Sequence, residues 1–190
     1  DHTSQWIISD NSWKTAPSPV IDATIYDAEI YDAAKEIPGW DKPYFNDNNW
    51  IAVNTPATTT INIISEYAPP IQITQTLSPD SIYKVSNNTY VFDLGQNMVG
   101  WAKLKVRGNK GDTIRMRFAE VLLPDGNIST INLRKAKATD YYILRGKGEE
   151  IFEPHFTYHG FRYVEVSSIK YHPDKSTITG CVFHTNNPVS

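Results

Sequence analysis

The chain has one cysteine, Cys181, among its 190 residues. A single cysteine excludes an intramolecular disulfide framework and any zinc site built on cysteine ligands. It lies in an apolar, strand-like run, TITGCVFH, where a buried structural thiol is favoured over a nucleophile. Long apolar runs are also missing, since no stretch approaches the roughly 20 residues of a membrane span. We therefore expect neither disulfides nor a membrane partner.

An excess of charge of one sign is missing as well. The net charge is −3 and the pI is near 5.9, so the sequence predicts no nucleic-acid partner. The pattern GxxxxGK[ST] does not occur, and Gly95 with Gly100 does not fit GxGxxG, so nucleotide binding is unsupported. No GxSxG elbow suggests a Ser-His-Asp triad. No signal peptide is visible and the chain starts at Asp1, so the compartment stays open, with an extracellular or periplasmic location favoured over a cytoplasmic one.

Helical signals are weak, whereas 12 prolines, 11 tyrosines and 5 tryptophans favour strands and turns. The clearest pattern is AKLKVRGNKGDTIRMRFAEV (102–121), in which apolar and basic residues alternate on both sides of a glycine-rich turn at 108–112. This alternation predicts an antiparallel hairpin with one face on a core. The residues expected in that core are Leu104, Val106, Ile114, Met116 and Phe118, and Ala102 alternates on the same face.

The opposite face of this predicted hairpin carries only basic charges. They are Lys103, Lys105, Arg107, Arg115 and Arg117. Because like charges opposite one another destabilise a sheet, carboxylates from a neighbouring strand or an acidic partner must cover this face. The candidates within the chain are Glu120, Glu149, Glu150 and Glu165, and internal balance is the favoured interpretation.

Further strands are expected at 139–144, 151–156, 161–166 and 177–184, with a helical turn at 132–138. Short strands at such intervals predict an all-β fold, an antiparallel sandwich of the jelly-roll type. We place this sandwich at 77–187, after an extended, proline-rich linker at 54–76 and before the start of another linker at 188–190. Residues 1–53 hold four of the five tryptophans and are expected to be the C-terminal part of a preceding β domain.

Carboxylates and aromatic rings gather in IYDAEIYDAAKEIPGWDKPYFNDNNW (25–50). Such groups suit sugar hydroxyls and C–H faces, and the same oxygens suit Ca²⁺. The weak sugar-binding candidates are Asp27, Glu29, Tyr31, Asp32 and Trp40, and Ca²⁺ is the one possible cofactor. The alternative is a structured loop whose carboxylates cap turns. His155 and His159 lack an evident third ligand, which favours structural roles over a metal site.

The motifs carry a resemblance to a known family. YVFDLGQNMVGWAKLKVRGNKGDTIRMRFAEVLLPDGNI (90–128) and TDYYILRGKGEEIFEPHFTYHGFRYVEV (139–166) resemble the concanavalin-like β-sandwich domain of bacterial α-L-rhamnosidases, glycoside hydrolase family 78. SDNSWKTAPSPVIDATIYDAEIYDAAKEIPGWDKPYFNDNNW (9–50) is similar to the family's N-terminal domain, with Ala28 where glycine is usual. The resemblance implies that terminal L-rhamnose is cleaved by carboxylates of a following (α/α)6 barrel.

Three functions follow from this resemblance and from the residues. The leading one is a non-catalytic piece that supports the catalytic (α/α)6 domain of the same parent chain. The second is a carbohydrate-binding module for rhamnose-containing glycans. The third, an autonomous inverting glycosidase, requires two carboxylates roughly 6.5–9.5 Å apart in one cleft.

The stretch YVFDLGQNMVGW (90–101) opens the resembling region and raises the question of a sugar-contacting loop. We expect a structural bend between strands, in which glycines adopt unusual backbone angles and amides satisfy turn groups. A sugar contact is the minority interpretation. The residues of this motif are Asp93, Gly95, Gln96, Asn97, Gly100 and Trp101.

Overall fold

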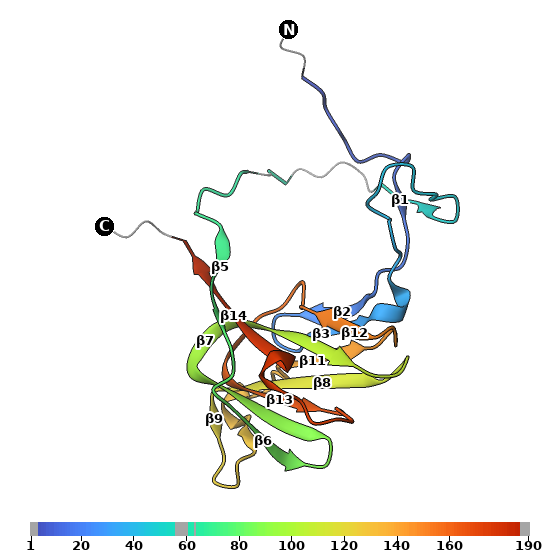
Figure 1. Ribbon diagram of the computed structural model, residues 1–190. Helices are drawn as coiled ribbons and strands as arrows, with labels where there is room; N and C mark the ends of the chain where they lie inside the picture. Colours follow the sequence, from blue (N-terminus) through green and yellow to red (C-terminus); the bar gives the residue numbers. More distant parts are fainter. Residues whose placement is uncertain (1–3, 56–60, 63, 187–190) are drawn as a thin grey trace. The chain divides into compact units, whose positions relative to one another are not determined.

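The computed structural model describes residues 4–55, 61–62 and 64–186 and consists mostly of strands and connecting loops (Figure 1). It divides into two compact units. Unit 1 comprises Asp1–Ser18 and Lys35–Tyr67, and unit 2 comprises Pro19–Ala34 and Ala68–Ser190. The all-β prediction is confirmed, because the helical segments are three short 3₁₀ turns, η1 (Ala33–Lys35), η2 (Ile131–Leu133) and η3 (Lys175–Thr177), in the described part of the chain.

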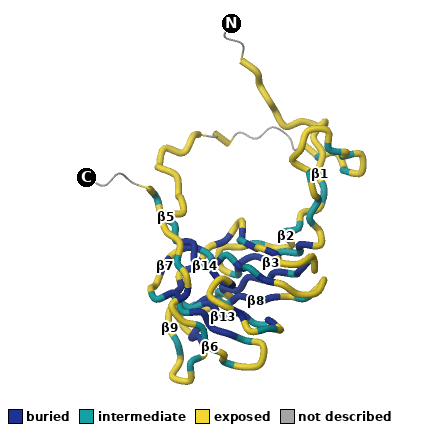
Figure 2. Tube along the Cα trace, viewed as in Figure 1, coloured by how far each residue is buried: buried dark blue, intermediate teal, exposed yellow. Residues whose placement is uncertain are grey.

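Unit 1 contains little regular structure. Two short strands, β1 (Lys14–Thr15) and β4 (Ile51–Ala52), pair antiparallel. An ion pair of 2.8 Å joins Lys14 Nζ to Asp47 Oδ1, and the Phe45 and Trp50 rings meet edge to face at 5.7 Å. None of the described residues of unit 1 is buried, as the tube in Figure 2 shows. The unit is therefore held by turns and surface contacts.

Unit 2 is built around one curled ten-stranded sheet. Its path runs β2-β3-β11-β8-β13-β7-β14-β5, and β6 and β12 also pair with β7. All pairings are antiparallel except that of β3 with β11. A separate small ribbon joins β9 (Val121–Leu122) to β10 (Ile128–Ser129). The sheet strands are β2 (Val20–Thr24), β3 (Ala28–Asp32), β5 (Ile71–Leu77), β6 (Ser81–Ser86), β7 (Thr89–Arg107), β8 (Thr113–Ala119), β11 (Thr139–Ile143), β12 (Glu149–Phe152), β13 (His159–Ser167) and β14 (Ile178–Thr185).

β7 is the organising strand of unit 2. It is 19 residues long, and its first part pairs with β6 and β13 while its second part pairs with β14 and β12. Figure 1 shows this strand curving, which lets the sheet turn back on itself. One hydrophobic cluster therefore takes residues from both parts of β7, among them Phe92 and Leu104, and from β8 and β13.

The hairpin prediction for 102–121 is wrong about which strands pair, but the predicted core-facing side of each strand is confirmed. β7 and β8 are separated in the sheet by β13, so the turn at 108–112 connects strands that do not pair. All five predicted core residues, and Ala102 on the same face, are nevertheless buried in the same cluster. Alternation reports which side of a strand meets the core, but it does not report the strand's neighbour.

The basic face is balanced from within the chain at four of its five positions. Arg115 and Arg117 of β8 both contact Glu165 of β13, with nitrogen–oxygen distances of 3.1 and 3.4 Å. Lys105 meets Glu149 at 3.2 Å, as expected. Lys103 instead meets Glu153 at 2.9 Å, a partner that the sequence did not suggest. The Arg107 guanidinium lies over the Tyr171 ring.

The other two predicted acidic partners have different roles. Glu120 Oε2 accepts a hydrogen bond of 2.7 Å from the side-chain amide of Asn132, at the start of the predicted helical turn. That turn is shorter than expected, since the 3₁₀ helix η2 ends at Leu133. Glu150 is buried and accepts hydrogen bonds within unit 2. Neither carboxylate contributes to the basic face.

The expected division of the chain differs from the compact units in two segments. Residues 20–32, assigned to the first domain, form β2 and β3 of the large sheet, because β3 pairs with β11 far along the chain. Residues 71–76, assigned to the linker, form most of β5, which pairs with β14. The expected linker at 188–190 lies outside the described residues.

Candidate functional site

The sugar-binding candidates lie in both units. Asp27, Glu29, Tyr31 and Asp32 belong to unit 2, whereas Trp40 belongs to unit 1. Asp27 pairs with Lys137 at 3.0 Å, and this hydrogen bond lowers the pKa of the Asp27 carboxyl. Asp32 Oδ1 accepts a hydrogen bond of 3.0 Å from the Ala34 backbone N–H. Both carboxylates thus have protein partners.

Glu29 is fully buried, and its carboxylate holds the loop that precedes β13. Oε2 accepts hydrogen bonds from the backbone N–H groups of His155 and Phe156, at 2.8 and 3.0 Å. Oε1 lies 3.0 Å from His155 Nδ1. The Tyr31 ring stacks on the His155 ring at 5.5 Å, with an interplanar angle of 12°. These contacts hold the FTYHGFRY segment in place and do not form an open sugar-binding site.

A second acid–imidazole pair lies beside the first, and in this one both partners are buried. Asp140 of β11 is fully buried, and its Oδ1 accepts the Glu29 backbone N–H at 2.9 Å. Its Oδ2 lies 3.5 Å from Nε2 of His159, whose ring stacks on Phe118 at 4.1 Å. His155 and His159 are therefore drawn to two different carboxylates. This accords with structural roles for the two histidines.

Glu150 forms a third buried carboxylate centre. It accepts hydrogen bonds from the Tyr142 hydroxyl at 2.8 Å and from three successive backbone N–H groups, those of residues 145–147. Burial alone raises the pKa of Glu150, but these hydrogen bonds together bring it below its ordinary value of 4.5. A carboxylate with four donors fixes the turn between β11 and β12.

The DLGQN motif lies inside β7 rather than between two strands. Asp93 pairs with the Arg162 guanidinium through two hydrogen bonds, 2.7 and 2.9 Å long. Hydrogen bonding to Arg162 lowers the pKa of the Asp93 carboxyl. Asp93 Oδ1 also accepts the Gly95 backbone N–H at 2.8 Å. Opposite this point the register with β13 shifts between Phe161 and Tyr163. The motif therefore marks an irregularity where β7 bends.

The glycines of this motif are required by their surroundings. Gly95 has a φ of +80°, in the left-handed region, and a Cβ there would collide with the Asp80 carboxylate. A Cβ at Gly100 would collide with the Cys181 carbonyl of β14. Gln96 and Asn97 are exposed. Trp101 donates its indole N–H to Glu153 Oε2 at 3.1 Å and packs against Phe183 at 5.2 Å.

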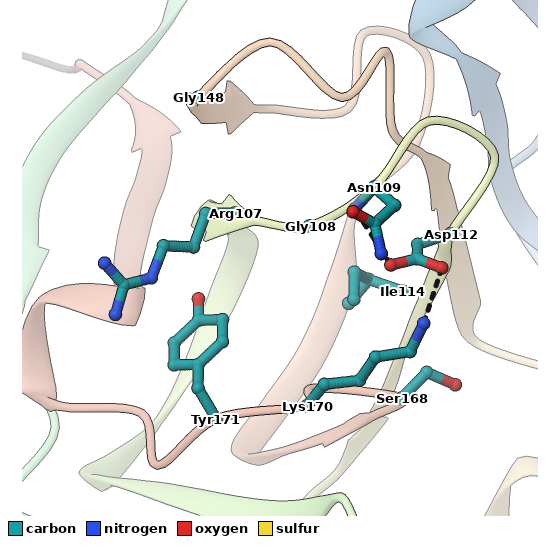
Figure 3. A pocket seen from close by; sticks show the side chains of 9 residues that line it. All are labelled: Arg107, Gly108, Asn109, Asp112, Ile114, Gly148, Ser168, Lys170 and Tyr171. Carbon is teal, nitrogen blue, oxygen red and sulfur yellow. Dashed lines mark hydrogen bonds and ion pairs between the residues drawn. The ribbon is translucent and has the colours of Figure 1, made fainter.

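A surface pocket of about 350 Å³ lies in unit 2, beside the turn at 108–112 (Figure 3). Asn109, Asp112 and Lys170 gather on one side of the view, and Arg107 lies with Tyr171 on the other. Asp112 is the acidic lining residue, and the hydrogen bond of 2.7 Å from Lys170 lowers its pKa. The full lining is Arg107, Gly108, Asn109, Asp112, Ile114, Gly148, Ser168, Lys170 and Tyr171.

Unit 1 has a pocket of about 400 Å³ that is lined by Ser9, Asp10, Asn11, Ser12 and Thr55. Asp10 is its acidic residue, and its Oδ1 accepts a hydrogen bond from the Ser12 hydroxyl, which lowers the pKa of Asp10. Neither of these two pockets of described residues therefore brings two carboxylates together.

No group of three or more His, Cys, Asp or Glu side chains within 4–55, 61–62 and 64–186 is arranged to hold a metal ion. In the same residues, no helix has the length and apolar character that crossing a bilayer demands.

Sequence reasoning missed the residues that complete these centres. These residues are Asp140, Glu153 and Arg162, and each has a partner more than 50 residues away in the sequence. The partner of Arg162, for example, is Asp93. The one available signal was the placement of Asp140 in the ATD-x-Y motif and of Arg162 in HGFRY. Both motifs were identified as part of the resemblance, without individual roles.

The chain belongs to the bacterial α-L-rhamnosidase family. Residues 83–184 match the model of the bacterial α-L-rhamnosidase concanavalin-like domain, and residues 1–75 match that of the α-L-rhamnosidase N-terminal domain. The sandwich prediction and the family resemblance are thus confirmed. The two matches meet between residues 75 and 83, close to the end of β5.

Curated relatives are much longer than this chain. An α-L-rhamnosidase of Streptomyces avermitilis is 44% identical over 99% of the chain, which spans 18% of that relative. An α-L-rhamnosidase of Formosa agariphila is 42% identical over 98% of the chain, which spans 20% of it. The chain thus corresponds to about a fifth of these enzymes.

Solved structures agree with this assignment. The Streptomyces avermitilis α-L-rhamnosidase, crystallised with L-rhamnose, has a TM-score of 0.93 at 44% identity, covering 98% of this chain and 18% of that one. The α-L-rhamnosidase of Dictyoglumus thermophilum has a TM-score of 0.88 at 45% identity, covering 96% and 21%. That of Aspergillus terreus has a TM-score of 0.86 at 37% identity, covering 95% and 21%.

Proposed function

We propose that this chain is a non-catalytic β portion of an α-L-rhamnosidase, whose role is to support the catalytic (α/α)6 domain of the parent protein. The parent would hydrolyse terminal α-L-rhamnose from glycans or glycosides. The observation that carries the proposal is the placement of the acidic residues. Neither the pocket beside the turn at 108–112 nor the pocket of unit 1 holds two carboxylates, which glycoside hydrolysis of the usual kind requires.

The buried carboxylates support the same proposal. Glu29, Asp140 and Glu150 each accept backbone N–H groups, and together they fix the loops around β11, β12 and β13. A carboxylate that is occupied in this way is not available as a general acid or base toward a sugar. Their role is to hold the sandwich rigid, which is what a supporting domain must be.

Hydrolysis of an aryl α-L-rhamnoside tests the proposal. The purified 190-residue chain is expected to release no aryl alcohol above the spontaneous rate. The full-length Streptomyces avermitilis relative, assayed in parallel, controls for substrate and conditions. Turnover by this chain that disappears when one of its own carboxylates is replaced would overturn the proposal.

Carbohydrate binding is a second candidate function, which the exposure of Trp40 favours. This side chain is 64% exposed, as an aromatic platform for a sugar must be. Glu29 is buried inside unit 2, so the candidates that keep some exposed surface are Asp27, Tyr31, Asp32 and Trp40. The rhamnose-containing ligand and a Ca²⁺ requirement remain predictions, and both are tested by the titration described below.

A further inference from the structure

The pocket beside the turn at 108–112 has an unpaired cation on its rim (Figure 3). Arg107 is the one basic residue on the outer face of β7 and β8 that meets no carboxylate in the described part of the chain. Its guanidinium lies over the Tyr171 ring instead, 5.0 Å from the ring centre. Stacking on an aromatic face holds a guanidinium in place and leaves its planar edge of N–H donors available to a ligand.

Two carboxylates near Arg107 are engaged with other groups. Glu149 faces Arg107 across the β12–β7 pairing, but its carboxylate contacts Lys105 Nζ at 3.2 Å. Asp174 lies within electrostatic reach of Arg107, but its Oδ1 accepts the Ser176 backbone N–H at 2.8 Å as the cap of η3. The positive charge of Arg107 is therefore not neutralised by an ion pair with either residue.

Asp112 is the acidic residue of the pocket, and both of its carboxylate oxygens are occupied. Oδ1 accepts a hydrogen bond of 2.7 Å from Lys170 Nζ, and Oδ2 accepts the Asn109 backbone N–H at 2.9 Å. Arg107 and Lys170 together outweigh Asp112, so the lining carries one net positive charge. Because charge complementarity selects the ligand that balances the charge of its site, this lining favours a monoanion.

The rest of the lining suits a small polar ring. The pocket holds about 350 Å³, near the lower end of the roughly 300–1,000 Å³ that is typical of small-molecule sites. Ile114 and the half-buried Tyr171 contribute apolar surface for C–H groups. Asn109 and Ser168 are exposed residues of the same lining, whose amide and hydroxyl groups can bond to ligand hydroxyls. An aromatic ring, hydroxyl partners and one spare cation together match a sugar that carries a carboxylate.

We propose that this pocket binds a monosaccharide unit with one carboxylate, such as a uronate. The Arg107 guanidinium holds the carboxylate through two parallel N–H···O bonds, the geometry for which its planar fork is suited. The sugar hydroxyls bond to Asn109 and Ser168, and the C–H groups of the ring contact Tyr171. This site is separate from the supporting role proposed above and does not depend on it.

NMR titration of the purified chain with D-glucuronate tests this proposal. We expect saturable shifts of the backbone amide signals at 108–112, with a dissociation constant on the order of 1 mM. D-Glucose has the same ring without the carboxylate, and it should bind at least about tenfold more weakly because the charge-assisted bonds are missing. Inorganic sulfate and phosphate carry charge without the ring, and each should also bind at least about tenfold more weakly.

Variants of the two lining cations identify the groups that bind. Arg107→Gln removes the unpaired charge and should weaken glucuronate binding about tenfold or more. Arg107→Lys keeps the charge but not the fork, so its loss should be intermediate. Lys170→Gln leaves the charge of Asp112 uncompensated and should also weaken binding, and this variant replaces Arg107→Gln should that one fail to fold by circular dichroism.

Lys147→Gln is the matched control. It removes one positive charge from an exposed residue of the neighbouring turn that does not line the pocket. Because a solvent-exposed charge at a distance is largely screened, this variant should change the dissociation constant less than about twofold.

Four results would overturn the proposal. The first is the absence of saturable shifts up to about 20 mM glucuronate, and the second is a set of shifts that Arg107→Gln leaves unchanged. The third is sulfate or phosphate binding as tight as that of glucuronate, which would leave a simple anion site. The fourth is binding to the 190-residue chain that is absent from the full-length parent protein, since the parent's own residues would then fill the pocket.

Discussion

The two units contain similar side chains but use them differently. Unit 1 has aromatic residues in abundance, yet Trp6, Trp13 and Trp40 are 87%, 48% and 64% exposed. Unit 2 buries twenty residues in one cluster, because its curled sheet places both parts of β7 over the same core. Aromatic content alone therefore does not make a core, whereas a sheet that curls over its own apolar face does. The stability of this chain is expected to reside in unit 2.

The largest effect should come from the centre of that core. Met116 is fully buried on β8, so Met116→Ala removes its contacts and leaves a cavity. We expect a loss of about 2–5 kcal/mol in the free energy of unfolding, measured by chemical denaturation. A loss under about 0.5 kcal/mol, the size of an ordinary surface effect, would contradict the assigned face of β8.

A smaller effect is expected at the buried Glu150. In Glu150→Gln an amide NH₂ replaces one oxygen, so at least one of the backbone N–H groups at 145–147 loses its acceptor. This should cost about 1–3 kcal/mol of unfolding free energy at pH 7.

The pH dependence of this variant follows from the lowered pKa of Glu150. A carboxyl whose pKa is lower in the folded state contributes stability above its ordinary pKa, here 4.5, and loses it as the pH falls through the folded value. The difference in unfolding free energy between the unsubstituted chain and Glu150→Gln should therefore be complete above about pH 5 and shrink below about pH 4. A difference that is constant from pH 7 to pH 3 would show that the carboxylate charge is not what stabilises the turn.

Ala28→Gly should move stability in the opposite direction. Ala28 is buried at the β2–β3 turn with a φ of 92°, a backbone angle that disfavours any side chain. Glycine, usual here in the resembling motif, removes that strain of roughly 1–2 kcal/mol but loses a buried methyl group and some chain entropy. We expect a net gain below about 1 kcal/mol, seen as a higher denaturation midpoint. Ala34→Gly, at an exposed neighbouring residue, is the control.

The smallest effect is expected at Trp40 of unit 1. Because its side chain is largely exposed, Trp40→Ala should change the unfolding free energy by no more than about 0.5 kcal/mol. In the unsubstituted chain, titration with millimolar L-rhamnose, first with Ca²⁺ and then with chelator, should shift no NMR signal near Trp40. A shift that Trp40→Ala abolishes in a folded variant would instead support the carbohydrate-binding function.

The sequence was informative about faces and less so about partners. Alternation along 102–118 identified five core residues, and four later strands were located to within a few residues. The neighbour of each strand could not be predicted from the sequence. β13, which separates β7 from β8 in the sheet, begins 40 residues after β8 ends. Hydrophobic periodicity is a local property, whereas strand order is set by pairings across the whole chain.

The same limit applies to the site residues. Glu29 was noticed as a carboxylate beside aromatic rings, which is the composition of a sugar site. Its partners, the N–H groups of His155 and Phe156, lie 126 and 127 residues away, so its structural role was not visible. The Asp93–Arg162 pair spans 69 residues and was missed for the same reason.

The length of β7 has a consequence for how this protein is made. Three of its four partner strands lie between Glu149 and Thr185, so most of this 19-residue strand has nothing to pair with until the residues of those later strands have left the ribosome. Pairings between such distant segments make folding slow, and the waiting strand exposes apolar residues meanwhile. A chain cut before β14 would leave residues 101–103 of β7 and the whole of β5 without a partner strand, and we expect it to aggregate rather than to form a smaller sandwich.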